Sequence, residues 1–191
     1  MDNKLRKNMY ISLLVAQGVI IGLLENMIPF PFAIAPGAKL GLANLITIIA
    51  IFTMKKSDSF LLVMLRLFLT TLLGGTMSTF FYSLAGSVLS YFGMLLVKSF
   101  GPKRVSIIGI SATGGFLHNV GQLVVASLIA GSWSVMLYLP VLSLIGILAG
   151  FALGISANYL LEHVDTLKKF QINYEQSQKI SKRFRQSKER S

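Results

Sequence analysis

The sequence predicts an all-α membrane protein with six transmembrane helices and both termini in the cytoplasm. Of its 191 residues, 53% are hydrophobic and 13% are charged, whereas about 25% of the residues of a typical soluble domain are charged. The apolar residues fall into separate runs, and nearly all basic residues stand between or outside these runs. We therefore divide the chain into a transmembrane domain over residues 1–164 and a basic cytoplasmic tail over residues 165–191.

The apolar runs have the length that membrane helices need, which is about 20 residues, with about 17 as a workable minimum. The predicted spans are residues 9–28, 39–54, 60–73, 77–97, 105–130 and 135–161. The first run is longer than the roughly 7–15 apolar residues of a signal peptide, so we interpret it as a retained helix. The second and third spans reach only roughly 21–24 Å of a hydrocarbon core of about 30 Å. Either these two spans extend at their ends, or irregular backbone lies at membrane depth and lines a cavity.

The basic residues indicate the orientation. In a six-span arrangement, 16 of the 18 lysines and arginines fall on one side, and the exceptions are Lys39 and Arg66. Because Lys and Arg are retained in cytoplasmic loops, we expect a multi-pass protein of the bacterial inner membrane. The net charge of +11 is then a topology signal and does not indicate nucleic-acid binding. We expect the tail to be a solvated or frayed extension, which is compatible with attraction to anionic lipid.

Several enzyme classes find no support in the sequence. The chain has no cysteine, which excludes disulfides and thiolate metal sites. It has no Walker A loop, no zinc-binding HExxH motif and no nucleophile elbow. Its seven acidic residues do not form the carboxylate cluster that would hold magnesium against a diphosphate. We therefore expect no catalytic residue, no metal site and no cofactor in this chain.

Polar residues inside the spans are the candidates for function, because an ionisable group there costs about 2.5–3.5 kcal/mol on insertion scales. Most of them fall between the midplane and the outer surface. The candidate substrate-binding residues are Glu25, Lys39, Asn44, Arg66, His118, Asn119 and Gln122, with weaker support for Ser78, Thr79 and Tyr82.

Two interpretations of these polar residues remain open. Glu25 could form a structural ion pair with Arg66 or Lys39, or the group could line an outward-facing pocket for an acidic or phosphorylated ligand. The apolar outer loop at residues 29–36 would then lie in the membrane interface or cover the ligand as a lid.

Small residues four positions apart form stripes on the first and sixth spans, and such stripes let helix backbones approach closely in lipid. They serve either packing inside the bundle or contact with a separate membrane protein. The candidate partner-interface residues are Ser12, Ala16, Gly18, Gly22, Gly146, Gly150 and Gly154.

Residues 36–44, which read PGAKLGLAN, follow a proline-rich outer loop in this six-span chain. In this the chain resembles the Gx transporter family, often labelled heptaprenyl diphosphate synthase component I and grouped with the substrate-binding S components of energy-coupling factor (ECF) transporters. The resemblance covers about residues 9–161. Residues 36–44 are its most specific part, and Arg66 and the stretch 114–122 also resemble the family.

The resemblance implies a six-helix S-component fold with a ligand pocket near the outer face. It also implies two kinds of partner, a transmembrane T component and two cytoplasmic ATPases. S components commonly contact the T component through small residues of the first helix, here Ser12, Ala16, Gly18 or Gly22. Two alternatives are a non-catalytic accessory subunit of prenyl or quinone synthesis and a scaffold of a redox or assembly complex.

Overall fold

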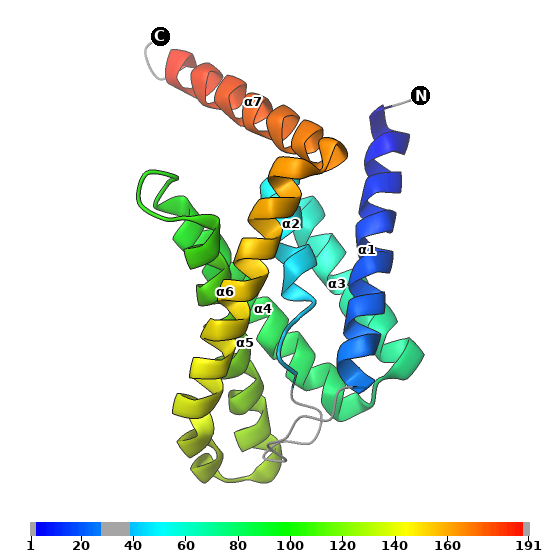
Figure 1. The fold of residues 1–191 in the computed structure, drawn as a ribbon, viewed down its shortest axis with the longest axis vertical. Helices are drawn as coiled ribbons and strands as arrows, with labels where there is room; N and C mark the ends of the chain where they lie inside the picture. The colour runs from blue at the N-terminus through cyan, green and yellow to red at the C-terminus, as the bar shows by residue number, and fades with distance from the viewer. Residues whose placement is uncertain (1–2, 28–38, 189–191) are drawn as a thin grey trace.

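In the computed structural model, the described residues are 3–27 and 39–188, with side chains described within 5–27 and 39–176. Every regular element in these ranges is a helix (Figure 1), which confirms the all-α prediction. The elements are α1 (Asn3–Met27), α2 (Asn44–Thr53), α3 (Lys56–Gly74), α4 (Met77–Ser99), α5 (Ile107–Ala130), the 3₁₀ helix η1 (Trp133–Tyr138), α6 (Leu139–His163) and α7 (Asp165–Lys188).

Five segments are long and apolar enough to cross a membrane, namely α1, α3, α4, α5 and η1 with α6. Their outward faces carry large hydrophobic side chains, such as Leu72 on α3 and Leu148 on α6, which are 70% and 59% exposed. Such a surface suits lipid rather than water, and the protein is therefore a multi-pass membrane protein. The second predicted span differs: α2 has only ten residues, or about 15 Å.

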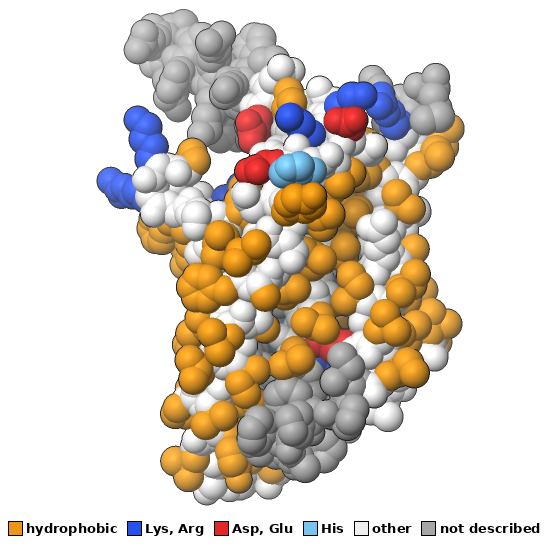
Figure 2. Space-filling view, in the orientation of Figure 1, with side chains coloured by type: hydrophobic (Ala, Val, Ile, Leu, Met, Phe, Trp, Pro, Cys, Tyr) orange, Lys and Arg blue, Asp and Glu red, His pale blue; other side chains and the backbone are white. Residues whose placement is uncertain are grey.

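The helices alternate in direction. α1, α3 and α5 run away from the end of the bundle at which both chain termini lie, while α4 and α6 return to it (Figure 1). Figure 2 shows most of the charged side chains on this face at this same end, above a surface that is mainly hydrophobic, with a few charged atoms nearer the opposite end. The basic connections thus share one end of the bundle, which we call the basic end. Its assignment to the cytoplasm remains a prediction of the charge rule.

Glycines bring α5 into backbone contact with α6. A Cβ atom added at Gly115 would lie 2.0 Å from the carbonyl oxygen of Gly146, and one at Gly150 would lie 2.6 Å from that of Ser111. At Gly154 an added Cβ would lie 2.7 Å from the Cα of Ile108. The glycine stripe of the last span therefore packs inside the bundle, against α5.

The small residues of α1 divide between two faces. Gly18 and Gly22 are buried and face α3, where an added Cβ would lie 2.6 Å from the Cδ of Arg66 and 2.9 Å from the Cγ2 of Thr70, respectively. Ser12 and Ala16 lie on the exposed face of the same helix. Of the candidate interface residues on α1, these two are the ones left open to lipid or to another protein.

The short helix α2 lies inside the bundle, with eight of its ten residues buried. Two other helices bind its last turn. The Lys98 ammonium of α4 donates at 2.6 Å to the carbonyl of Ile51, a backbone group that an isolated helix end would leave to water. The Tyr10 hydroxyl of α1 donates to Thr53 Oγ1 at 3.0 Å, a side-chain contact that joins α1 to α2.

The tail is helical and its first turns are docked, so the expectation of a solvated or frayed extension does not hold for them. Leu167 of α7 is buried. The ring of Phe170 stacks on Tyr10 with 3.9 Å between ring centroids and 8° between planes. The tail carries few apolar residues, but two of them, Leu167 and Phe170, pack against the bundle.

Candidate functional site

The candidate site is built around a break in helical structure. Residues 39–43, just before α2, are not helical, and Gly41 has a φ of +83°. Backbone N–H and C=O groups in such a segment have no intrahelical partners, and away from water each unsatisfied group is costly. Buried polar side chains from three helices supply the missing partners.

Glu25, from the last turns of α1, holds this segment through two backbone amides. Its Oε1 accepts hydrogen bonds from the N–H groups of Gly41 at 2.5 Å and Leu42 at 3.1 Å, and the residue is 5% exposed. Hydrogen bonds to an ionised carboxylate are stronger than neutral ones. Glu25 thus serves as the hydrogen-bond acceptor for the non-helical backbone at Gly41 and Leu42.

The alternative of a direct ion pair involving Glu25 finds no support. Between the described side chains, the ion pair within 4.0 Å joins Lys7 and Asp58, at the basic end. Lys39 and Arg66 act on Glu25 electrostatically from a longer range.

Gln122 of α5 holds the same segment from the other side. Its amide Nε2 donates to the carbonyl of Lys39 at 2.8 Å, and its Oε1 accepts from the Lys39 N–H at 2.7 Å. Asn119, one turn earlier, donates from Nδ2 to the carbonyl of Leu142 on α6 at 2.6 Å. The sequence predicts both residues as ligand contacts, and the structure places them in contacts between segments of the protein.

Arg66 of α3 joins four parts of the fold. Its guanidinium donates to the carbonyl of Ala43 and to Ser87 Oγ of α4 at 3.3 Å, and it is 4% exposed. Its aliphatic stem lies against Gly18 of α1, where the absence of a side chain leaves room for it.

These groups surround a small cavity of about 30 Å³. Five of the seven predicted substrate-binding residues line it, together with hydroxyl-bearing residues of α3 and α4. The polar and charged lining residues are Glu25, Lys39, Asn44, Arg66, Thr70, Thr71, Ser83, Ser87 and His118. Since a water needs about 10–15 Å³ of such space, the cavity as it stands has room for two or three waters, and a larger ligand requires it to widen. The predicted lid, residues 29–36, lies outside the described residues.

Several polar atoms at this cavity have no hydrogen-bond partner within the described part of the chain. They are Asn44 Nδ2, Ser83 Oγ and both ring nitrogens of His118. The His118 ring lies against the backbone of Gly86, close enough to interact electrostatically but without the geometry of a hydrogen bond. Buried polar groups are nearly always satisfied in folded proteins, so these atoms indicate that the cavity holds polar molecules.

Other buried polar atoms without partners lie away from the cavity lining, and all of them are hydroxyls. They belong to Thr47, Ser90, Ser111, Ser127 and Ser143. A helical Ser or Thr hydroxyl can turn toward a carbonyl of its own helix, whereas an asparagine amide and an imidazole need partners elsewhere. The buried polar atoms that lack a hydrogen-bond partner and cannot find one in their own helix therefore lie at the cavity.

The sequence analysis missed Thr70, Ser83 and Ser87. Thr70 follows Arg66 by four positions, and Ser83 and Ser87 are also four apart, so each pair shares a helix face. That spacing could have identified them. Tyr82, which had weaker support from the sequence, packs against Ala126 and does not line the cavity. In the described ranges no group of three or more His, Asp or Glu side chains could hold a metal ion.

Gly41 provides a test of the site's geometry. An added Cβ would lie 3.0 Å from both Asn44 Nδ2 and His118 Cδ2, on top of the cost of a positive φ. We expect Gly41→Ala to destabilise the protein by about 2–3 kcal/mol, measured by unfolding in detergent. Gly101→Ala is the matched control, because Gly101 has a φ of +90° with nothing within 4 Å; it should lose only about 1–2 kcal/mol. Equal losses in the two variants would show that the cavity wall is not tightly packed there.

The family model described as heptaprenyl diphosphate synthase component I matches residues 14–160, a range that contains all seven candidate substrate-binding residues and excludes α7. No curated protein and no solved structure shows significant similarity to the chain.

Proposed function

Since the chain belongs to the heptaprenyl diphosphate synthase component I family, we propose that it is a non-catalytic membrane subunit that binds a small anionic molecule in the polar cavity. The observation that carries this proposal is the set of buried, unpartnered polar atoms around that cavity. In detail, we propose an S-component-like subunit of an ECF-type transporter in a bacterial cell membrane. Its ligand would be a vitamin-like or cofactor-like acid or phosphate.

The charge of the cavity favours an anion. Two cations, Lys39 and Arg66, face one carboxylate, Glu25, so one positive charge is left over. Glu25 and Arg66 are already engaged with the backbone of residues 41–43. The groups available to a ligand are therefore the Lys39 ammonium, Asn44 Nδ2 and the His118 ring, and a carboxylate or phosphate would accept hydrogen bonds from all three.

The cavity lies toward the end of the bundle opposite the basic end, where α1 and α3 finish. With the basic end in the cytoplasm, the ligand enters from outside. Binding widens the cavity by moving the non-helical segment at residues 39–43, which is tied to the bundle by side chains rather than by a continuous helix. Partner ATPases then drive the release of the ligand inside.

The partners in this proposal are a transmembrane T component and two cytoplasmic ATPases. The exposed face of α1 supports this choice, because Ser12 and Ala16 are one turn apart and open to a neighbouring helix. A contact surface on α1 would use these two residues and not Gly18 or Gly22, which face α3.

Lys39 offers the sharpest test of ligand binding, because its backbone is held by Gln122 while its ammonium makes no hydrogen bond with any described residue. We expect Lys39→Gln to fold normally. Its occupancy by the anion that co-purifies with the wild type should fall by about tenfold or more, since a charge-assisted hydrogen bond contributes about 1.5–3 kcal/mol. Mass spectrometry of the purified protein gives the occupancy. Lys103→Gln, exposed at the basic end, should keep wild-type occupancy. Equal occupancy in the two variants would refute the proposed site.

The family description favours a second candidate, an accessory subunit of a prenyl diphosphate synthase. In that case deletion of this chain lowers prenyl diphosphate synthesis by the co-purified partner, and Lys39→Gln does not. A parallel loss of bound anion and of uptake in Lys39→Gln cells supports the transport function instead.

A further inference from the structure

A second cavity lies at the basic end, between α1, the junction of α2 with α3, and α7. Its volume is about 250 Å³, against about 30 Å³ for the polar cavity. Its cationic lining consists of Arg6, Lys7, Lys55 and Lys169, and its aromatic lining includes Tyr10 and Phe170.

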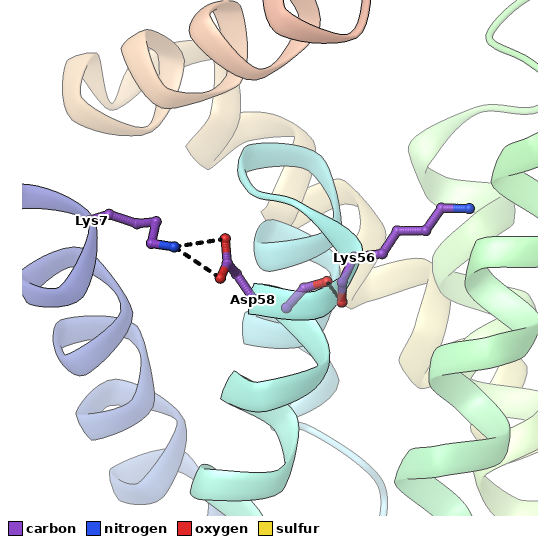
Figure 3. Close-up of polar contacts among 4 residues, drawn as sticks. Lys7, Lys56 and Asp58 are labelled. Carbon is purple, nitrogen blue, oxygen red and sulfur yellow. Dashed lines mark hydrogen bonds and ion pairs between the residues drawn. The ribbon is translucent and has the colours of Figure 1, made fainter. Parts of the chain in front are cut away.

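Among the described side chains, one acidic residue lines this second cavity, Asp58, and it is already paired. Lys7 Nζ lies 3.1 Å and 3.3 Å from the two carboxylate oxygens of Asp58. Figure 3 shows this pair joining α1 to the start of α3, with the side chain of Lys56 extending away from it. The pair forms part of the wall and leaves three cations for another partner.

Those three cations come from three different elements. The Arg6 guanidinium carbon lies 5.9 Å from the centroid of the Phe170 ring, so aromatic contact supports it while its donors remain available. Lys55 and Lys169 are exposed, and neither makes a hydrogen bond or ion pair with a described residue. Three like charges around one cavity repel each other until an anion enters.

The walls of the second cavity continue into apolar surface. Tyr10 and Phe170 form a stacked pair, and Met54 is a further apolar lining residue. On the adjoining turns of α1, Leu5 and Met9 are 52% and 56% exposed. A cationic pocket beside a lipid-facing surface at the edge of a membrane suits a molecule with a phosphate head and an apolar body.

We propose that the cavity at the basic end binds a phosphate group, presented by an anionic lipid headgroup or by a soluble phosphate compound, between Arg6, Lys55 and Lys169. The phosphate oxygens accept hydrogen bonds from the guanidinium and the two ammonium groups. Because these groups belong to α1, the α2–α3 junction and α7, the bound phosphate fastens the tail helix to the bundle. This site is separate from the polar cavity near the opposite end.

The test compares two triple variants of the full chain in an uncharged detergent. The cavity variant is Arg6→Gln, Lys55→Gln and Lys169→Gln. The control variant is Lys103→Gln, Arg104→Gln and Lys168→Gln, which removes the same charge from exposed positions that do not line the cavity. Each is titrated with dihexanoyl phosphatidylglycerol and, separately, with inorganic phosphate, following the melting temperature, and native mass spectrometry counts the lipids bound.

For the wild type we expect saturable stabilisation and one retained phosphatidylglycerol. The concentration giving half of the stabilisation should rise by about tenfold or more in the cavity variant, which lacks all three cations proposed to bind the phosphate, and by less than about twofold in the control, whose residues do not line the cavity. Stabilisation by the lipid alone identifies a lipid headgroup, and equal stabilisation by inorganic phosphate identifies a soluble source. Equal weakening in both variants, or no saturable binding of either probe, overturns the proposal.

Discussion

Replacing Glu25 with leucine should remove about 3–5 kcal/mol of stability, the usual loss when one partner of a buried charged cluster is deleted. The Gly41 and Leu42 amides would lose their acceptor, and the two cations of the cavity would face each other without a carboxylate. Since total stabilities are commonly about 5–15 kcal/mol, much of the folded population would be lost. Unfolding in mixed micelles, followed by circular dichroism, measures the change.

Two further variants separate the causes of the Glu25 effect. Glu25→Gln keeps one acceptor oxygen and removes the charge, so its loss should be smaller than that of the leucine variant. Asn26→Ala is the neighbouring control: Asn26 is exposed and makes one 3.3 Å hydrogen bond to the carbonyl of Gly74, worth about 1 kcal/mol or less. If Glu25→Leu were no more harmful than Asn26→Ala, the carboxylate would not be holding the broken backbone.

Gly115→Ala should be the second most damaging substitution, with a loss of about 3 kcal/mol, the upper end of the usual range for overpacking. Its Cβ would lie 2.0 Å from the carbonyl oxygen of Gly146. Because the obstructing atom is backbone, no side-chain rotation relieves the overlap, and α5 and α6 must separate. Thermal unfolding in detergent measures the loss.

Gly109→Ala on the same helix is the matched control for Gly115. Its added Cβ would meet Val105 Cγ1 at 3.4 Å, an ordinary contact. Since alanine is favoured over glycine in a helix by about 1 kcal/mol, this variant should be unchanged or slightly more stable. A similar loss in both variants would mean that the backbone contact between Gly115 and Gly146 does not set the effect, since helix propensity alone favours alanine at both positions.

The parts of the fold that follow local sequence could be predicted. α4 and α5 lie close to the predicted spans because each is a continuous apolar run, bounded by charge, proline or glycine. α1 begins at Asn3 rather than residue 9, and the 3₁₀ helix η1 takes up the first part of the predicted sixth span. α3 begins at Lys56 rather than residue 60, because its first turn is polar and projects beyond the apolar run.

The start of α2 could not be predicted from local sequence. The predicted span begins at Lys39, with irregular backbone at membrane depth left open as an alternative. The structure has such irregular backbone, and α2 begins at Asn44 after Gly41 at positive φ. The irregular turn persists because Glu25 and Gln122, 16 and 83 residues away from their backbone partners, satisfy its polar groups. Only the three-dimensional arrangement reveals contacts of that separation.

The sequence predicted most of the residues of the candidate site, but it did not predict the role of each one. The cost of burying charge singled out Glu25, Arg66 and His118, and the structure brings them to one cavity with Lys39 and Asn44. The sequence could not show that Glu25 and Arg66 already bind backbone. That division of roles leaves Lys39 as the charged group free for a ligand and selects it as the residue to mutate.

The central claim is that the polar cavity faces the outside of the cell, and the absence of native cysteine permits a direct measurement. Single cysteines at Thr71, which lines the polar cavity and is half-buried, and at Lys55, exposed at the basic end, are treated in intact cells with a membrane-impermeant thiol reagent. We predict labelling of Thr71→Cys in intact cells and of Lys55→Cys only after permeabilisation. Labelling of Lys55→Cys in intact cells, with Thr71→Cys protected until the membrane is opened, would contradict the account.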